Sequence, residues 1–516
     1  MQGGGETLSL AQGVALLFLS GALTKVLGLL YRVPLSYLLG AEGIGLYQMA
    51  YPVFTVTTVL ATGGLPTAVA KVMAEHLALG REDDAWLVFR VGRQVLVLQG
   101  LLLALLLFAA APTLAAQILG DPRARLPLQA LAPAVFLLAL EGSLKSYFQG
   151  RQMLAVLAEA QALEQLFRVL TMLGLAFLLL PRGLEYAAAG ATAGAAGGAA
   201  CSVLFFEWRR RRLPKLKGGG RGLSWYASLR RLEHTALPVM FGSFIMPLMQ
   251  MVDAAIVPVR LQAGGIPMRT ATALFGQHAG MALSLVGIPT VATTALATAL
   301  VPSLAAAAAQ GDRLGLVRRT RQAIALTLAI AIPATLGLYA FPTEICTVLF
   351  NTPEAAVPLR YLAFGTIGLC LMETTGAVLH GLGLGHWAAL AVFLGGAVNA
   401  VLDYHLSALP SLNIKGAALG TASGFTLAAM ISLACLNRRV PGCWSFQLLV
   451  APSLAATLMV AFVRWVLGHA LGCGLPLAAA TLGAVGAGIA FYGFLALATG
   501  IIPAGLLLRP PHKPTW

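Results

Sequence analysis

Long apolar runs recur along the whole chain, separated by short connections that hold most of the polar residues. The runs approach the length of about 20 residues that a helix needs to cross a bilayer. They are too long for the alternating strands of about ten residues that build a membrane β-barrel. The pattern therefore predicts an all-α, polytopic membrane protein. Its fourteen expected spans cover residues 8–31, 44–67, 94–118, 126–148, 153–180, 185–206, 236–257, 278–302, 321–341, 357–380, 386–407, 414–436, 445–468 and 474–502.

Composition agrees with this pattern. Of the 516 residues, 58% are hydrophobic and only 10% are charged, and the mean hydropathy is +0.83. Such a composition excludes an ordinary soluble domain. The first apolar run has no basic residue before it and no small-residue cleavage site after it. We therefore expect it to be the first span rather than a removable signal peptide.

Motifs for chemistry are missing from the sequence. The six cysteines are scattered, mostly within apolar runs, without CxxC or His/Cys spacing for a metal. We expect them to be small buried side chains rather than disulfides or zinc ligands. No Walker loop, HExxH helix, GxSxG elbow or glycosyltransferase-like Asp cluster occurs. The sequence thus predicts no catalytic residue, no metal and no cofactor, in a protein that is not an enzyme.

The basic residues are distributed unevenly between alternate connections. The set that follows the even-numbered spans holds 23 of the 34 Lys and Arg residues when Lys145 and Arg321, at the adjoining ends of two spans, are included. Basic residues favour the cytoplasmic side, so both termini are predicted to be cytoplasmic. The run Arg209–Arg212 lies before Gly218–Gly220, which marks a flexible joint. We expect this basic joint to contact anionic membrane lipids rather than nucleic acid.

An internal repeat divides the chain near this joint. Residues 187–194 align with residues 417–424 at an offset of 230, and Gln48 aligns with Gln277 at an offset of 229. An even number of spans in each half gives a parallel repeat, which characteristically encloses a cavity at the membrane midplane. We therefore predict two pseudo-symmetric six-helix lobes and two added C-terminal helices. The expected divisions are residues 1–206, 207–235, 236–437 and 438–516.

Cations within apolar helices are the first candidate substrate-binding residues. Lys25, Gly28 and Arg32 share one helical stripe, and neither cation has an acidic residue three or four positions away. This stripe is suited to an external anion, although Arg32 could instead extend to the membrane interface. Arg260 is expected to join these cations at the cavity. Asp253 lies about 10 Å from it along the helix axis and could balance the cations or carry a proton.

Uncharged and acidic side chains provide further candidates. Gln48 and Gln277 could bind sugar hydroxyls or phosphate, and the alternative is an amide hydrogen bond between helices. Glu373 is a second candidate for ion coupling, with helix packing as its alternative. Two pairs of opposite charge at i, i+4 spacing are expected to be structural. These pairs are Glu141 with Lys145, and Glu164 with Arg168.

Four segments resemble the stage V sporulation protein B group of polysaccharide exporters. They are Lys25–Pro34, Gly40–Pro52, Pro247–Gln262 and Ile414–Thr421. This group belongs to the multidrug/oligosaccharidyl-lipid/polysaccharide superfamily and is related to the lipid II flippase MurJ. The resemblance implies a MATE/MurJ-like fold and alternating access. It places Lys25 at a position where MurJ proteins have basic cavity residues, whereas Arg32 departs from the acidic residue usual there.

The resemblance also implies a function in the bacterial cytoplasmic membrane. The expected cargo is an undecaprenyl-diphosphate-linked sugar, either lipid II or a polysaccharide precursor, for cell-wall, spore-cortex or polysaccharide synthesis. The helices within residues 445–502 resemble a pair that forms a groove for the lipid tail. One alternative is a cation-coupled drug antiporter, although cationic drugs favour acidic cavities. The other is a non-transporting scaffold that recruits cell-wall synthases.

Overall fold

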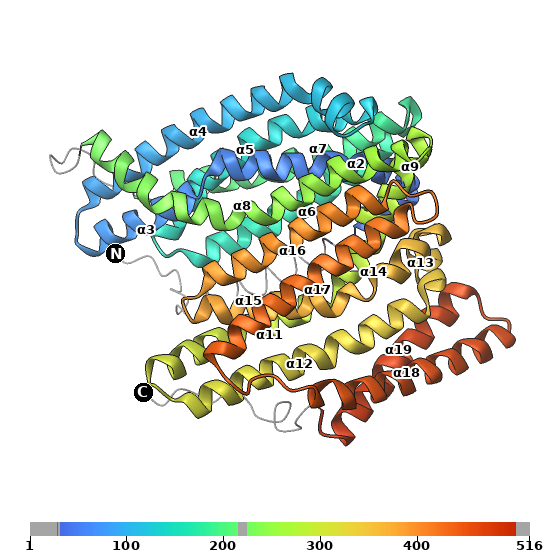
Figure 1. The fold of residues 1–516 in the computed structure, drawn as a ribbon. Helices are drawn as coiled ribbons and strands as arrows, with labels where there is room; N and C mark the ends of the chain where they lie inside the picture. Colours follow the sequence, from blue (N-terminus) through green and yellow to red (C-terminus); the bar gives the residue numbers. More distant parts are fainter. Residues whose placement is uncertain (1–27, 29–30, 215–223, 502–516) are drawn as a thin grey trace. The chain divides into compact units, whose positions relative to one another are not determined.

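The computed structural model describes residue 28 and residues 31–214 and 224–501 (Figure 1). These residues are mostly helical and contain no strand, which confirms the predicted all-α class. Within the described residues, eleven helices are long and apolar enough to cross a membrane, or up to thirteen if each of two bent pairs is one span. The predicted span 8–31 lies largely outside the described residues, so the count of fourteen stays a prediction.

The described residues form two compact units that divide near residues 262–277. The first unit holds α2 (Arg32–Thr62), α3 (Leu65–Ala78), α4 (Glu82–Thr113), α5 (Arg125–Gly150), α6 (Leu154–Leu179), α7 (Leu184–Arg211), α8 (Trp225–Ala263) and α9 (Met268–Phe275). The second unit holds α10 (Leu283–Val286), α11 (Ile288–Ala309), α12 (Arg313–Ala340), α13 (Pro342–Phe350), α14 (Ala356–Leu362), α15 (Gly365–Gly381), α16 (Gly385–Leu406), α17 (Ile414–Arg439), α18 (Gln447–Gly472) and α19 (Leu477–Ala498).

Helix α8 packs with the first unit, although the sequence repeat assigns it to the second lobe. Trp225 near its start donates a 3.1 Å hydrogen bond to Gln94 on α4. Gln262 near its end donates a 3.0 Å hydrogen bond to the Gly120 carbonyl. The compact units therefore divide later in the chain than the predicted lobes. The predicted lobes, with their linker at residues 207–235, stay a prediction.

Helix α2 contains the whole connection, residues 32–43, that the expected spans 8–31 and 44–67 leave between them. The chain is instead helical from Arg32 to Thr62, and only Gly40 leaves the helical region, with φ 60° and ψ −175°. Glycine adopts this positive φ without a Cβ clash, so one residue can hold the break. The expected break between two helices is therefore confirmed at Gly40, whereas the expected length of the connection, residues 32–43, is wrong.

Glycines on α7 allow it to approach α6 closely. A Cβ atom added at Gly190, Gly194 or Gly198 would lie 2.7, 2.8 or 2.6 Å from a main-chain oxygen of α6. Larger side chains would force the helices apart, so the small residues at every fourth position set their spacing. This contact holds the charged segment of α6, which contains Glu164 and Arg168, against α7.

The aligned glycine segment in the second unit makes the same kind of contact. On α17, a Cβ atom at Gly424 would lie 2.8 Å from the Gly395 carbonyl oxygen of α16. The two copies of the sequence repeat, on α7 and α17, thus both bring helix backbones together.

The last two helices pack on each other and on α12. The rings of Phe462 on α18 and Phe491 on α19 stack with centroids 4.5 Å apart. The Tyr492 hydroxyl donates a 2.8 Å hydrogen bond to the Ala329 carbonyl of α12. This buried polar bond and the ring contact join α19 to both of its neighbours.

Candidate functional site

The kink in α2 brings two parts of one helix together around Arg32. Tyr47 hydrogen-bonds to Tyr31 and interacts electrostatically with the half-buried Arg32. In a straight helix, 16 residues would separate the Cα atoms of these tyrosines by about 24 Å. The kink at Gly40 therefore folds the start of α2 back toward its middle. Lys25, the other cation of the predicted stripe, lies outside the described residues.

A second cation, Arg168 on α6, extends this polar region. Its guanidinium forms an ion pair with Glu164, which confirms the predicted i, i+4 pair. Both side chains are only 19% exposed. Arg168 also interacts electrostatically with Tyr47 and Tyr51, whose rings stack 5.4 Å apart. Helices α2 and α6 thus place arginines beside tyrosine rings and hydroxyls. The arginines can bind phosphate, and the tyrosine hydroxyls can bind sugar groups.

Glu141 on α5 is a buried acid whose partner the sequence did not indicate. Its Oε1 accepts a 2.8 Å hydrogen bond from Ser202 on α7. Lys145 is exposed and interacts with Glu141 electrostatically, but the two form no ion pair within 4.0 Å in the described chain, so the expected close pair is replaced by the bond from Ser202. The second oxygen, Oε2, is buried without a hydrogen-bond partner among the described residues. This oxygen is able to accept a proton or contact a cation.

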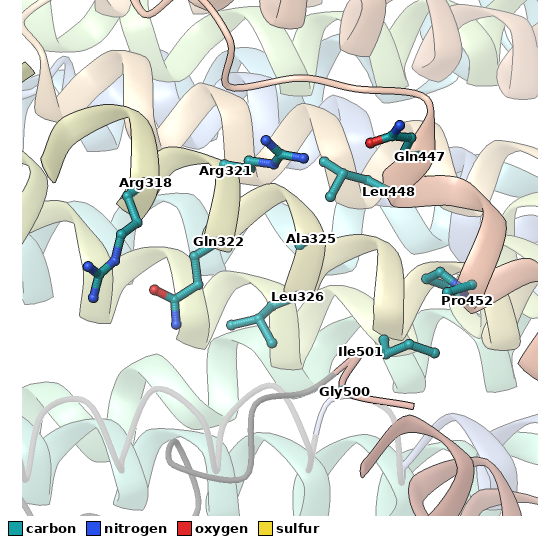
Figure 2. Close-up of a pocket in the computed structure, with 11 residues that line it drawn as sticks. Arg318, Arg321, Gln322, Ala325, Leu326, Gln447, Leu448, Pro452, Gly500 and Ile501 are labelled. Atoms are coloured by element: carbon teal, nitrogen blue, oxygen red, sulfur yellow. The ribbon is translucent and has the colours of Figure 1, made fainter. Parts of the chain in front are cut away.

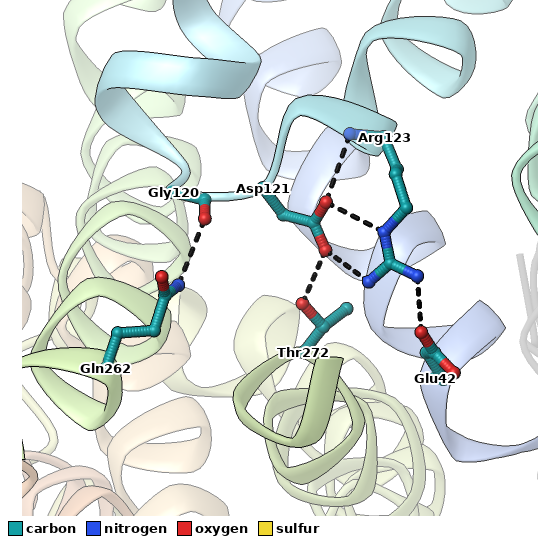
Figure 3. A network of polar contacts seen from close by, with 6 residues as sticks. All are labelled: Glu42, Gly120, Asp121, Arg123, Gln262 and Thr272. Carbon is teal, nitrogen blue, oxygen red and sulfur yellow. Dashed lines mark hydrogen bonds and ion pairs between the residues drawn. The ribbon is translucent and has the colours of Figure 1, made fainter. Parts of the chain in front are cut away.

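A network around Asp121 joins three parts of the first unit (Figure 3). The Asp121 side chain is fully buried and binds the Arg123 guanidinium, with Nη2 2.7 Å from Oδ2 and Nε 3.0 Å from Oδ1. Thr272 on α9 donates a 2.7 Å hydrogen bond to the same Oδ2. Arg123 also forms an ion pair with Glu42 on α2. Sequence reasoning missed this network, because its partners lie far apart in the chain.

Local sequence explains how Asp121 reaches this position. Gly120 has a φ of 73°, which lets the chain turn sharply after α4. Asp121 then caps the short 3-10 helix Pro122–Ala124, accepting a 3.0 Å hydrogen bond from the Arg123 backbone N–H. An Asp before Pro at a tight connection is a typical helix start, and this was the one available signal.

Helices α2 and α9 meet at backbone distance beside the network. A Cβ atom added at Gly45 would lie 2.0 Å from the Thr272 carbonyl oxygen. A Cβ atom added at Gly276 would lie 2.1 Å from the Ala41 carbonyl oxygen. Only glycine fits at these positions, so this contact fixes the place of the Thr272 hydroxyl.

The predicted glutamines lie in different compact units. Gln48 is half-buried on α2, whereas Gln277 is buried in a π-helical segment, Gly276–Ala282, of the second unit. Its neighbour His278 is also buried and lies 3.3 Å from the Thr421 hydroxyl of α17. The predicted arrangement of both glutamines around one cavity stays a prediction.

The remaining predicted residues also fall on membrane-spanning helices. Asp253 is half-buried within α8, and Arg260 is half-buried in the last turn of the same helix. Glu373 on α15 accepts a 2.6 Å hydrogen bond from Thr294 on α11. This bond joins two helices, which is the packing role that we considered as the alternative for Glu373.

Metal ligation has no support in the part of the chain that the structure describes. No group of three His, Cys, Asp or Glu side chains is placed there to hold a metal ion. All six cysteines are free, and three of them are buried. Cys473 is exposed, which differs from the predicted burial.

A basic groove lies between α3 and the start of α8. It has a volume of ≈ 640 Å³, and its lining includes Lys71, Arg230, Arg231 and His234. Arg231 pairs at 2.6 Å with Glu75, which is the one acidic residue in the lining. The remaining basic side chains give the groove a positive charge that suits an anion.

Comparison with known proteins shows similarity along nearly the whole chain. Stage V sporulation protein B of Bacillus subtilis (strain 168) is 29% identical over 97% of this chain and 97% of its own length. Lipid II flippase MurJ of the same organism is 25% identical, over 89% of each chain. These two relatives confirm the resemblance seen in the sequence.

Solved structures show the same fold. A structure of lipid II flippase MurJ in an inward closed conformation matches with a TM-score of 0.71 at 15% identity, covering 96% of this chain and all of the other. An inward-facing MATE family transporter of the MOP superfamily matches with a TM-score of 0.67 at 15% identity, covering 81% of this chain and 95% of the other.

The model of the family described as polysaccharide biosynthesis protein matches residues 10–308. The chain is therefore a multi-pass membrane protein that belongs to the polysaccharide biosynthesis protein family.

Proposed function

We propose that this protein is a flippase for an undecaprenyl-diphosphate-linked sugar, lipid II or a polysaccharide precursor. It would move this lipid from the cytoplasmic to the outer leaflet for cell-wall, spore-cortex or polysaccharide synthesis. The observation that carries the proposal is the similarity to two relatives, stage V sporulation protein B and a lipid II flippase, over most of each chain. Since one of these relatives is a flippase and the sequence contains no catalytic motif, we propose no enzymatic activity.

The cations of the membrane-spanning helices support a diphosphate cargo. Arg32 and Arg260 are half-buried, and we propose that Lys25 joins them. A fixed cation about 4 Å from a phosphate charge contributes on the order of 4 kcal/mol at an effective dielectric of 20, before desolvation. Several such cations would offset much of the loss of water around a diphosphate.

Hydroxyl and amide groups suit the sugar. Tyr31 and Tyr47 place hydroxyls beside Arg32, and Gln48 and Gln277 carry amides that both donate and accept hydrogen bonds. In this proposal these groups bind the sugar while the cations bind its diphosphate. A cationic drug would be repelled by the same arginines, which argues against an antiporter.

The basic groove supports entry from the cytoplasmic side. Its residues Lys71 and Arg230 belong to the connections that hold most of the basic residues. We propose that these connections and both termini are cytoplasmic, in the membrane of a bacterium. The groove would then attract an anionic head group, or anionic lipids, before the head group enters the membrane region.

The Asp121 network supports a gate at the opposite membrane face. In the proposed topology, the α4–α5 and α8–α9 connections are extracytoplasmic. Thr272 on α9 then ties the α8–α9 connection to the α4–α5 connection on the outer side. Alternating access would require this bond to break when the outer side opens. We propose that Asp253 and Glu373 couple this change to an ion, and Glu141 is an additional candidate.

Reconstitution into liposomes tests the proposed function. Fluorescent lipid II is placed in both leaflets, and its exposure to an impermeant quencher or a lipid II-cleaving enzyme is followed over time. We expect this protein to accelerate translocation of lipid II but not of a phospholipid analogue without a diphosphate. Uptake of cationic dyes without lipid II translocation would favour the antiporter. If the protein moves neither lipid II nor dyes and copurifies with a cell-wall synthase, the scaffold is favoured.

A further inference from the structure

A pocket in the second unit lies between α12, the start of α18 and the residues after α19 (Figure 2). Its volume is ≈ 360 Å³. Arg318 and Arg321 line it from α12, and Gln447 lines it from α18. The two arginines are not among the cations of the proposed transport path, although α18 and α19 are the helices expected to hold the lipid tail of the cargo.

The charges of this pocket are not compensated within the described chain. Arg318 and Arg321 are both exposed, neither forms an ion pair with a described residue, and the lining contains no acidic side chain. Figure 2 shows the Arg321 side chain extending from α12 towards Gln447 and Leu448. Two guanidinium groups near an amide can bind a phosphate group through charge-assisted hydrogen bonds.

Apolar surface continues from these polar groups. Leu326, Leu448 and Pro452 also line the pocket. Further along α18, Val450 and Leu454 are 57% and 64% exposed. Such a surface is expected to contact acyl chains in a membrane-spanning helix.

Aromatic residues indicate the depth of the pocket in the membrane. Trp444 and Phe446 precede α18, and their rings contact each other with centroids 6.0 Å apart. Phe446 is 76% exposed. Tryptophan and other aromatic residues at a helix end are typical of the membrane interface, where phospholipid head groups lie.

We propose that this pocket binds an anionic phospholipid of the surrounding membrane, with its phosphate on Arg318 and Arg321 and an acyl chain along α18. A free phosphate would use the arginines alone and gain nothing from the apolar surface. The bound lipid would bridge α12 and α18, and it is a resident lipid rather than the transported cargo. This site goes beyond the proposed flipping and does not depend on it.

Lipid titration followed by native mass spectrometry tests the proposal. The purified, delipidated protein is titrated with phosphatidylglycerol, phosphatidylcholine or inorganic phosphate, as wild type and as the Arg318→Gln/Arg321→Gln variant. Each arginine near an anionic lipid contributes about a five-fold gain in affinity, so the double variant should bind phosphatidylglycerol roughly 25-fold more weakly. The matched control is Arg313→Gln/Arg438→Gln, which removes two exposed arginines outside the pocket.

The outcomes separate the possible ligands. The proposal predicts one phosphatidylglycerol molecule that the control retains, the pocket variant loses, and phosphatidylcholine does not replace. Equal binding by the pocket variant and wild type would overturn it. Displacement of the lipid by millimolar phosphate would overturn the assignment to a lipid. Preferential binding of undecaprenyl diphosphate to the arginines would assign the pocket to the cargo and also contradict the proposal.

Discussion

The Thr272 hydroxyl donates a 2.7 Å hydrogen bond to the buried Asp121 carboxylate, although the two residues lie 151 positions apart. Asp121 is fixed from the other side by Arg123. The carboxylate is therefore held in place by Arg123, two residues away in the chain, and Thr272 adds a bond from a distant segment. In the proposed topology this bond closes the outer side of the transporter.

Asp121→Asn should weaken the outer gate. The substitution removes the carboxylate charge that holds Arg123, at a cost of about 1–3 kcal/mol for a buried hydrogen bond to a charged group. Spin labels at Arg182 and Thr270, both exposed, would report on the distance across this end of the first unit. We expect an additional, longer distance in the variant. Arg125→Gln, which changes an exposed arginine outside the network, should leave the distance unchanged.

Gly45→Ala should disrupt the contact between α2 and α9. The added Cβ would lie 2.0 Å from the Thr272 carbonyl oxygen, so one of the backbones must move. Such overpacking typically costs about 1–3 kcal/mol. Gly174→Ala is the control, because its Cβ would have nothing within 4 Å. Thermal unfolding in detergent should show a lower Tm for Gly45→Ala only, and equal Tm values would contradict this account of the contact.

Arg168→Gln should destabilise the first unit more than the double variant Glu164→Gln/Arg168→Gln. The single change leaves Glu164, which is only 19% exposed, without its ion-pair partner. Breaking a buried pair from one side costs about 3–5 kcal/mol because one charge is left uncompensated, whereas replacing both residues leaves no buried charge and should cost less. A double-mutant cycle on denaturant unfolding measures the coupling. Additive effects would show that the pair contributes no coupling energy.

Gly219→Cys should resist membrane-impermeant thiol reagents in intact cells, in a background without native cysteines. The prediction follows from the density of basic residues in the 207–235 joint, which favours the cytoplasmic side. Labelling in permeabilised cells is the positive control. Rapid labelling of intact cells would reverse the proposed topology, and with it the placement of the Asp121 network on the outer side.

Features governed by membrane thickness and helix period were predictable from the sequence. The apolar runs predicted an all-α membrane protein, because bilayer thickness fixes the length of a helix that crosses it. Glu164 and Arg168 were recognised as a pair because side chains four residues apart lie on the same helix face. The same rule failed for Glu141. Ser202 of another helix supplies its hydrogen bond instead, and i, i+4 spacing carries no information about such a neighbour.

Features that depend on distant segments were not predictable. The bond from Thr272 to Asp121 requires α9 to pack on α2. No periodic pattern in a single sequence predicts such a contact between distant helices. A glycine-rich segment is compatible with a long loop and with a kink, so the sequence did not show that Gly40 alone holds the break. The proposed cavity residues Lys25, Arg260, Gln48 and Gln277 were chosen by chemistry and repeat position. Their meeting around one substrate therefore remains a prediction.

The most direct test of the central claim is lipid II translocation by cation variants in liposomes. Lys25→Ala and Arg260→Ala should each reduce the rate at least about ten-fold, since a lost phosphate contact of about 1.4 kcal/mol already gives that factor. Lys25→Arg should retain part of the rate because it keeps the charge, and Arg32→Ala should be milder. Wild-type rates for both Lys25→Ala and Arg260→Ala, at equal amounts of inserted protein, would contradict a cation-lined diphosphate path.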